Sequence, residues 1–427
     1  MNPKVNDADV NDVSDVIVVG AGVLGVCSAY FLAKEGMNVL LIDQEDIASG
    51  SSYGNAGLIV PSHSVPVAQP GVVKQGLKWM LDPESPFYVK PRLELSLLKW
   101  LWKFRAAANV HQRDKAMPVL QQLIMRSREL YQSFSVMDDM EFGFKENGVL
   151  YLFNTEQGLK EGEHEAELVA QVGIETQKLD REEVVAKLGG LSATVVGGIM
   201  YPQDANLQPA DFVRALAVRF QEMGGKFLHH TKAEGFEKKG NTIVGVRTSK
   251  GIFSADEIVL ATGSWTPNLA RELNINVPIQ AAKGYSITYR KPDGLPEIPV
   301  ICSEGRVAVS PIGETLRLAG TLELAGMDLS INQRRVNAII RQPRRYVPEY
   351  NTDDLELIEV WAGLRPLTPD GLSLLGRSHK YQNLTLAAGH AAIGMSSGPA
   401  SGQIVSQIVR NERPFMDISL MNPSRFG

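Results

Sequence analysis

The stretch VIVVGAGVLG at residues 16–25 decides the fold. Its apolar run, Val16 to Val19, is typical of a buried strand, and a Gly-x-Gly-x-x-Gly turn follows directly. An apolar helical pattern then extends to Lys34, and a second apolar run at 39–42 ends on Asp43. This order of strand, glycine turn, helix, strand and acid predicts a dinucleotide-binding unit.

Each of these residue types has a physical reason at its position in the unit. Gly20 permits a tight turn, Gly22 lets the main chain approach a pyrophosphate, and Gly25 lets the helix lie against the strand. The N-terminus of the helix offers unpaired N–H groups and the positive end of its dipole to phosphate. Asp43 stands where a carboxylate can accept both ribose hydroxyls.

The same region has a second interpretation, because residues 16–32 carry no charge and could be a membrane span or a signal peptide. Two observations argue against these interpretations: a signal peptide needs positive charge where the preceding tail has acids, and three glycines are unfavourable in a lipid-facing helix. We therefore expect a soluble protein with a short disordered N-terminus, whose acids are Asp7, Asp9, Asp12 and Asp15.

Composition sets further bounds. The chain has 427 residues, 44% of them hydrophobic and 21% charged, which is enough for two domains with full cores. A net charge of −5 argues against nucleic acid as a partner. Cys27 and Cys302 have no metal-binding or C-x-x-C spacing, so the sequence predicts no metal site and favours a reducing, cytoplasmic compartment.

The middle of the chain mixes helices and strands irregularly. Apolar residues at helical spacing predict an amphipathic helix over 120–134, and Asn147-Gly148 predicts a hairpin between 142–144 and 149–153. We therefore expect a separate α+β module inserted into the nucleotide domain. Further on, a helix is expected at 209–223. A strand is expected at 384–388, followed by a second helix from about 398 to 410.

The segment Leu93–Val110 is apolar on most sides, with only a narrow polar stripe at Ser96, Lys99 and Lys103. A helix of this kind is buried, or it lies on a membrane or on a partner. Ordinary helix packing and contact with a membrane surface both stay open.

Dispersed motifs add a resemblance to a known family. These motifs are the opening unit, Asn55-Ala56-Gly57, Pro70-Gly71, Ala261-Thr262-Gly263-Ser264-Trp265, Lys283-Gly284-Tyr285, Trp361 to Pro366, Thr368 to Gly371, and Ala388-Gly389-His390 with Gly394. Together they resemble FAD-dependent amino-acid oxidoreductases such as D-amino-acid oxidase, glycine oxidase and sarcosine oxidase. The closest resemblance is to the small-subunit family of bacterial D-amino-acid dehydrogenases, from about Asp15 to Arg410.

The resemblance implies an α/β fold: a Rossmann-like FAD-binding domain of the glutathione-reductase type, with an inserted α+β substrate domain on a mostly antiparallel sheet. The FAD-binding domain would be discontinuous, comprising residues 1–90, 190–280 and 360–427. The substrate-binding domain would comprise 91–189 and 281–359.

The resemblance also implies FAD as cofactor and assigns the residues that hold it. The pyrophosphate would lie on Gly20, Ala21, Gly22, Val23, Leu24 and Gly25, and the adenosine ribose on Asp43 and Gln44. The middle of the cofactor would meet Ser51, Ser52, Asn55, Ala56, Gly57 and Leu58, and adenine the main chain of Ala233. Further contacts are expected from Ala261, Thr262, Gly263, Trp265 and Gly363, and near the flavin ring from Gly389, His390, Ile393, Gly394 and Met395.

Three residues are expected at the reaction itself. Arg365 matches the family's arginine, and a planar guanidinium suits a substrate carboxylate because it donates two parallel hydrogen bonds. His63 is expected either as a lid over the substrate or as a solvated loop histidine. His390 is expected beside the flavin, where it either tunes the ring or only packs. Ala392 stands where glycine oxidase carries a second arginine, which puts glycine oxidase activity in doubt.

The expected activity is oxidative deamination of D-amino acids, including D-proline-like imino acids, by hydride transfer from Cα to flavin N5. The product is an imine and then a 2-oxo acid, and the electrons pass to a quinone or another non-oxygen acceptor. Two alternatives stay open: a secondary-amine oxidase of the sarcosine or proline type, and a flavin-bearing subunit of a multi-protein dehydrogenase. The expected location is the cytoplasm, with peripheral association at the inner face of the cytoplasmic membrane as an option.

Overall fold

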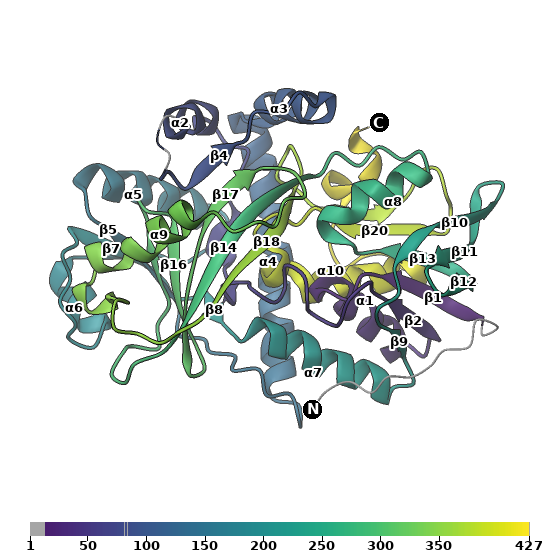
Figure 1. Ribbon diagram of the computed structural model, residues 1–427, viewed down its shortest axis with the longest axis horizontal. Coiled ribbons are helices and arrows are strands. Elements are labelled where there is room, and N and C mark those ends of the chain that lie inside the picture. Colours follow the sequence, from purple (N-terminus) through teal and green to yellow (C-terminus); the bar gives the residue numbers. More distant parts are fainter. Residues whose placement is uncertain (1–12, 81, 83, 427) are drawn as a thin grey trace.

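The computed structural model describes residues 13–80, 82 and 84–426, built around two large sheets (Figure 1). The expected disordered tail therefore lies almost wholly outside the described residues. The first sheet has the order β19-β20-β13-β1-β2-β9. Its strands are parallel except β19, which runs antiparallel to β20. They are β1 (Ser14–Val19), β2 (Val39–Ile42), β9 (Lys226–Leu228), β13 (Ala255–Leu260), β19 (Leu374–Arg377) and β20 (Leu384–Ala388).

The opening apolar run is buried on both faces of this sheet, as parallel strands require. Val16 and Val18 face a core shared with α1 (Val23–Lys34), α7 (Pro209–Glu222), α10 (Gly394–Val409) and α4 (Val110–Ser135). Ile17 and Val19 face a second core, shared with α8 (Thr266–Glu272) and a three-stranded sheet of β10 (Ala233–Lys239), β11 (Thr242–Thr248) and β12 (Gly251–Phe253). The alternation of β1 side chains thus covers both faces and leaves the strand ends free for a site.

The second sheet has the order β18-β14-β17-β16-β15-β5-β7-β6 and is mostly antiparallel. Its strands are β5 (Val149–Phe153), β6 (Gln177–Leu179), β7 (Gly197–Tyr201), β14 (Gln280–Arg290), β15 (Val300–Cys302), β16 (Val307–Ile312), β17 (Thr315–Leu324) and β18 (Leu357–Leu367), with β4 (Phe87–Val89) paired to β17. The helices α5 (Glu156–Ala170), α6 (Arg181–Lys187) and α9 (Gln333–Arg341) pack on it. The expected α+β architecture is therefore confirmed.

Most expected elements are confirmed, but the hairpin is wrong. The helices expected at 209–223 and about 398–410 are α7 and α10, and the helix expected over 120–134 is the later part of α4. Residues 142–144 form no strand, because Lys145 bridges Asn206 and the Gly148 N–H donates to the Asp204 carbonyl. Gly148 still adopts a positive φ of 74°, so the turn signal is real but its partner lies elsewhere.

Strand pairing crosses the expected domain boundaries. The strands β4 and β7 pair within the second sheet, although the boundaries at 90 and 190 leave them with the FAD-binding part, and the boundary at 360 divides β18. The helix α4 packs on α10 beside the first sheet, although it falls in the expected substrate-binding part. The two-domain division stays an expectation. Strand pairing and helix packing join these segments to the part of the structure on the other side of the expected boundaries.

Two helices, α2 (Val72–Trp79) and α3 (Leu95–Ala107), lie together along one edge of the molecule at the top of Figure 1. Leu97 and Trp100 of α3 are buried, whereas Leu95, Leu98 and Trp102 are exposed. The helix is thus only half packed. Among the residues described, no helix has the length and apolarity needed to cross a membrane.

Candidate functional site

A cavity of about 1350 Å³ runs from the C-terminal ends of β1 and β2 to the strands β14, β17 and β18. Its volume exceeds the roughly 300–1,000 Å³ typical of a small-molecule site, which is what a dinucleotide together with a second ligand requires. All sequence-predicted site residues line it except Gly25 and Gly57. The structure therefore brings together segments that lie far apart along the chain.

The glycine turn fits its predicted role. Gly20 has a φ of +108°, and a Cβ there would lie 2.6 Å from the Ala261 carbonyl oxygen. A Cβ at Gly25 would lie 1.6 Å from the Gly20 carbonyl oxygen, so this glycine lets α1 begin directly against the turn. Gly22 is different. A Cβ there would meet only the Ser52 Oγ, at 3.4 Å, and Gly22 itself lines the cavity. These close approaches fit a turn built to receive a phosphate group.

Asp43 closes the adenosine end of the cavity. The Ala21 N–H donates to Oδ2 at 2.5 Å and the Glu45 N–H donates to Oδ1 at 2.9 Å, which fixes the carboxylate across the glycine turn. Burial raises the pKa of Asp43, and the hydrogen bond from Ala21 opposes this rise. Each oxygen keeps a lone pair for a ligand hydroxyl. Gln44 and Ala233 line the same end of the cavity.

The loop 49–57 is fixed along the cavity by contacts from distant strands. Ser51 Oγ donates to the Leu364 carbonyl at 2.7 Å, and the Val23 N–H donates to Ser52 Oγ at 3.0 Å. Arg317 of β17 was not predicted from the sequence, and its buried Nη1 donates to the carbonyls of Tyr53 and Asn55 at 3.1 and 2.8 Å. Its signal in the sequence is an arginine between two leucines of a strand.

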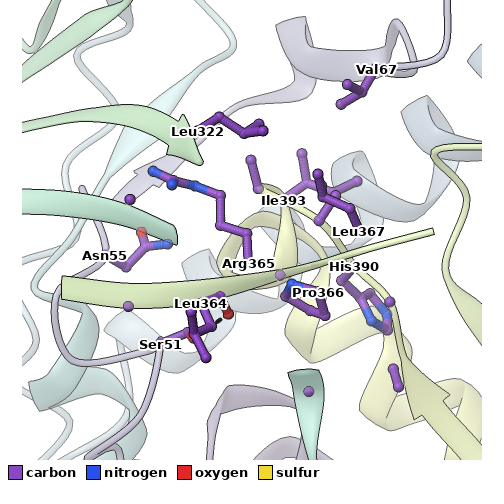
Figure 2. Close-up of a pocket in the computed structure, with 18 of the residues that line it drawn as sticks. Ser51, Asn55, Val67, Leu322, Leu364, Arg365, Pro366, Leu367, His390 and Ile393 are labelled. Carbon is purple, nitrogen blue, oxygen red and sulfur yellow. Dashed lines mark hydrogen bonds between the residues drawn. The ribbon is translucent and has the colours of Figure 1, made fainter. Parts of the chain in front are cut away.

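The C-terminal strand and helix close the opposite wall. Gly389 has a φ of +75°, which turns the chain from β20 toward the N-terminus of α10. His390 is buried and its Nε2 lies 3.0 Å from Ser401 Oγ. Burial lowers the pKa of His390 to about 3, so the ring is neutral at physiological pH. In Figure 2 its ring points away from the Arg365 guanidinium, which favours packing over a direct role with substrate.

Arg365 extends from β18 into the cavity between Leu322 and Asn55 (Figure 2). Its Nη1 donates to the Thr321 carbonyl at 3.0 Å. Gly284 makes room for it, because a Cβ there would lie 1.7 Å from Nη1. Burial lowers the pKa of the guanidinium, and within the described chain no acidic side chain pairs with it. A guanidinium stays charged nonetheless, so the cavity holds a cation without a counter-ion.

His63 lines the cavity from the short helix η1 (Pro61–Ser64). Its Nε2 lies 2.7 Å from the hydroxyl of Tyr151 on β5, a residue that the sequence analysis missed. Burial lowers the pKa of His63 to about 4, with a further contribution from the Arg306 cation. The solvated-loop interpretation of His63 is therefore wrong, because the residue is half-buried and its ring is hydrogen-bonded within the cavity wall. Its role as a lid over a substrate stays a prediction.

The sequence predicts no metal site, yet one surface cluster has ligand-type side chains. Asp46, His229 and His230 offer donor atoms that all lie within 4.8 Å of one another near the adenosine end of the cavity. Asp46 and His230 are exposed. Clusters of this kind are common on surfaces without a bound ion, and the cluster plays no part in the chemistry below.

Comparisons with known proteins agree with this geometry. Residues 15–408 match the family described as FAD dependent oxidoreductase. The chain is 32% identical to the D-amino acid dehydrogenase of Granulibacter bethesdensis, over 96% of this chain and 99% of that protein. It is 31% identical to the D-amino acid dehydrogenase of Bradyrhizobium diazoefficiens, over 96% and 99% of the two chains.

Solved structures share the fold at lower identity. Glycine oxidase from Geobacillus kaustophilus is similar with a TM-score of 0.79 at 21% identity, covering 97% of this chain and 99% of that one. L-proline dehydrogenase from P. horikoshii is similar with a TM-score of 0.77 at 22% identity, covering 97% and 98%. The family match, the full-length relatives and the cavity lead to one conclusion: the chain is an FAD-dependent enzyme and belongs to the FAD-dependent oxidoreductase family.

Proposed function

We propose that the protein oxidises D-amino acids, including cyclic imino acids, to imines that water converts to 2-oxo acids. The observation that carries this proposal is Arg365, a cavity-facing guanidinium without an acidic partner among the described residues. A buried cation without a counter-ion is costly, and a ligand carboxylate would offset that cost with two parallel hydrogen bonds. The full-length relatives named D-amino acid dehydrogenase support the same substrate class.

The residues that line the cavity support a binding mode for FAD that extends from the glycine turn to the segment 389–395. The turn at Gly20–Gly25 and the N-terminus of α1 would hold the pyrophosphate, Asp43 would hold the ribose, and the segment 389–395 would lie at the isoalloxazine. When bound, FAD supplies a two-electron acceptor that takes a hydride from the substrate carbon. The Gly389 turn and the N-terminus of α10 supply N–H groups where preorganised donors favour negative charge.

The remaining chemistry belongs to the protein's own side chains. Arg365 would bind and orient the carboxylate, which fixes the position of the α-carbon in the cavity. The apolar lining around it, including Leu322 and Ile393, would exclude water while the substrate is bound. The substrate must present an uncharged amine, because its lone pair drives the hydride out. No metal ion is needed for any of these roles.

We further propose that a membrane quinone accepts the electrons. The cavity lining extends to Leu77 on α2, Met80 directly after α2, and Trp102 on α3, so the cavity opens at the half-packed edge of the molecule. Exposed apolar side chains there include Leu95 and Leu98, and exposed cations on the same helices are Lys74, Lys78, Lys99 and Arg105. Exposed apolar and basic residues on the same two helices favour contact with an anionic lipid surface.

The test is a panel of D-amino acids, their L enantiomers, D-proline and sarcosine, with the holoenzyme and an artificial dye as acceptor. The proposal predicts dye reduction with D-amino or D-imino acids, a preference over L enantiomers, and little hydrogen peroxide in air. Preference for sarcosine with stoichiometric peroxide would support a secondary-amine oxidase instead. FAD-bearing protein that oxidises nothing on the panel would support a subunit that depends on a partner.

A further inference from the structure

One buried carboxylate is not explained by the roles above. Asp204 is fully buried in the turn after β7. It accepts two hydrogen bonds, from the Ser62 N–H at 3.0 Å and from Ser62 Oγ at 2.6 Å. Several buried or half-buried acids of this protein are paired with cations, such as Glu323 with Arg335 and Lys283, and Glu257 with Arg377.

Asp204 lacks such a partner among the described residues. The cation that lowers the pKa of Asp204 is Arg128 of α4, and that guanidinium is bound to Glu146 at 2.6 Å. An unpaired buried carboxylate costs several kcal/mol in general, so a fold rarely keeps one without a use. Burial accordingly raises the pKa of Asp204 to about 7. The group can therefore take up and release a proton near neutral pH.

Neighbouring polar groups connect this carboxylate to the cavity. The Ser62 hydroxyl donates to Asp204, and both Ser62 and Asp204 lie close enough to the Tyr151 phenol to influence its pKa. The Tyr151 hydroxyl lies 2.7 Å from His63 Nε2, and His63 lines the cavity. The second ring nitrogen of His63 has no protein partner in the described part of the chain, so it is the nitrogen left for a ligand.

We propose that these groups form a proton-transfer chain that takes a proton from the substrate's ammonium group and delivers it to a buried carboxylate, in the order His63, Tyr151, Ser62, Asp204. The proposal rests on the proposed oxidation of amino acids. It supplies the step that this reaction needs first, since an ammonium group has no lone pair with which to expel a hydride.

The proton balance closes along the chain. The substrate N–H bond breaks and its proton goes to His63 Nδ1, while the proton on Nε2 passes to the Tyr151 oxygen. The Tyr151 proton passes to Ser62, and the Ser62 proton to Asp204. The ammonium becomes a neutral amine and the carboxylate becomes a carboxylic acid, with no change in electrons. After the product leaves, the proton returns to solvent through His63 by the reverse path.

The groups around His63 and Tyr151 disfavour a charged form of either residue, so both would pass a proton on and not keep a charge. The Arg306 cation faces His63, and together with burial it keeps the ring from holding a proton. Glu165 of α5, Tyr201 of β7 and Asp204 itself face Tyr151, and burial with these groups holds the pKa of its phenol well above the usual value. Neither His63 nor Tyr151 is a stable charged intermediate, so Asp204 is the group that can keep the proton.

The test uses Tyr151→Phe, which cuts the chain, with Tyr201→Phe as matched control. Tyr201 is a neighbouring buried tyrosine whose ring centroid lies 4.9 Å from that of Tyr151, and it does not line the cavity. Flavin bleaching by a D-amino acid is followed anaerobically against pH. We expect Tyr151→Phe to slow it about 100-fold at neutral pH and to recover at alkaline pH, where the amino acid is already uncharged. The control should stay within about two-fold of wild type.

An equal loss at every pH, or no loss at neutral pH, would overturn the chain and leave Tyr151 a structural role. A second readout needs no substrate: infrared titration of the holoenzyme should show a carboxylic-acid carbonyl band that disappears near pH 7 and is missing in Asp204→Asn. Absence of the band in wild type would overturn the proposal even if D-amino acids are oxidised. Wild-type flavin that no amine bleaches would overturn the proposed function and, with it, the substrate end of the chain.

Discussion

At the scale of single residues, Arg365 is the side chain on which substrate recognition depends. Replacement by lysine keeps the charge but removes the two parallel donors. We expect Arg365→Lys to weaken apparent affinity for the carboxylate substrate ten-fold or more, about 1.4 kcal/mol or above. The measurement is KM together with binding of a non-oxidisable carboxylate, and D-amino acid amides serve as the control. An amide that loses as much as the acid would show that Arg365 does not read the carboxylate.

Asp204 gives a prediction about stability. Its folded-state pKa is raised from 3.8 to about 7, so the folded protein keeps a proton that the unfolded chain releases. This contribution to stability is fully present below pH 3.8, declines as pH rises, and is lost above about 7. As the pH rises from 3.8 to about 7, the free energy of unfolding of Asp204→Asn should therefore increase relative to that of wild type, by roughly 1–4 kcal/mol in total. Melting temperatures measured across this range, with exposed Asp138→Asn as control, check the sign.

At the scale of elements, two glycines where the glycine turn meets α1 have different roles: Gly25 is needed for the fold and Gly22 for cofactor binding. A methyl group at Gly25 meets protein backbone, whereas one at Gly22 has room in the protein, and Gly22 itself lines the cavity. Gly25→Ala should lower both the melting temperature and FAD content. Gly22→Ala should fold with an unchanged melting temperature as apoprotein but bind FAD at least ten-fold more weakly, about 1.4 kcal/mol. Equal effects of the two variants on the apoprotein would contradict this division.

Features that depend on local spacing could be predicted from the sequence, whereas contacts between residues far apart along the chain could not. The Gly20–Gly25 turn and Asp43 were predictable because their spacing is local and each position has one steric or hydrogen-bonding reason. The hairpin at Asn147-Gly148 failed because the turn residue was right while its partner, near Asp204, lies far along the chain. Ser62 and Asp204 are 142 residues apart, and only the packing of η1 on the second sheet brings them together.

At the scale of the whole molecule, the exposed edge formed by α2 and α3 decides where the enzyme works. If it docks on anionic lipid, Leu95→Glu with Leu98→Glu should reduce co-sedimentation with anionic vesicles several-fold and slow reduction of vesicle-held quinone, while dye reduction is unchanged. Val244→Glu, at an exposed apolar position on β11, is the matched control. Unaltered vesicle binding in the double variant would remove this edge as the docking surface.

The most direct test of the whole account is an anaerobic titration of the purified, yellow protein with D-alanine and, separately, with L-alanine. The account predicts that the D enantiomer bleaches the flavin absorbance stoichiometrically, that the L enantiomer does so poorly, and that Arg365→Lys requires far more D-alanine. Bound flavin that keeps its full absorbance with every D-amino acid, or bleaching that is indifferent to Arg365, would contradict it.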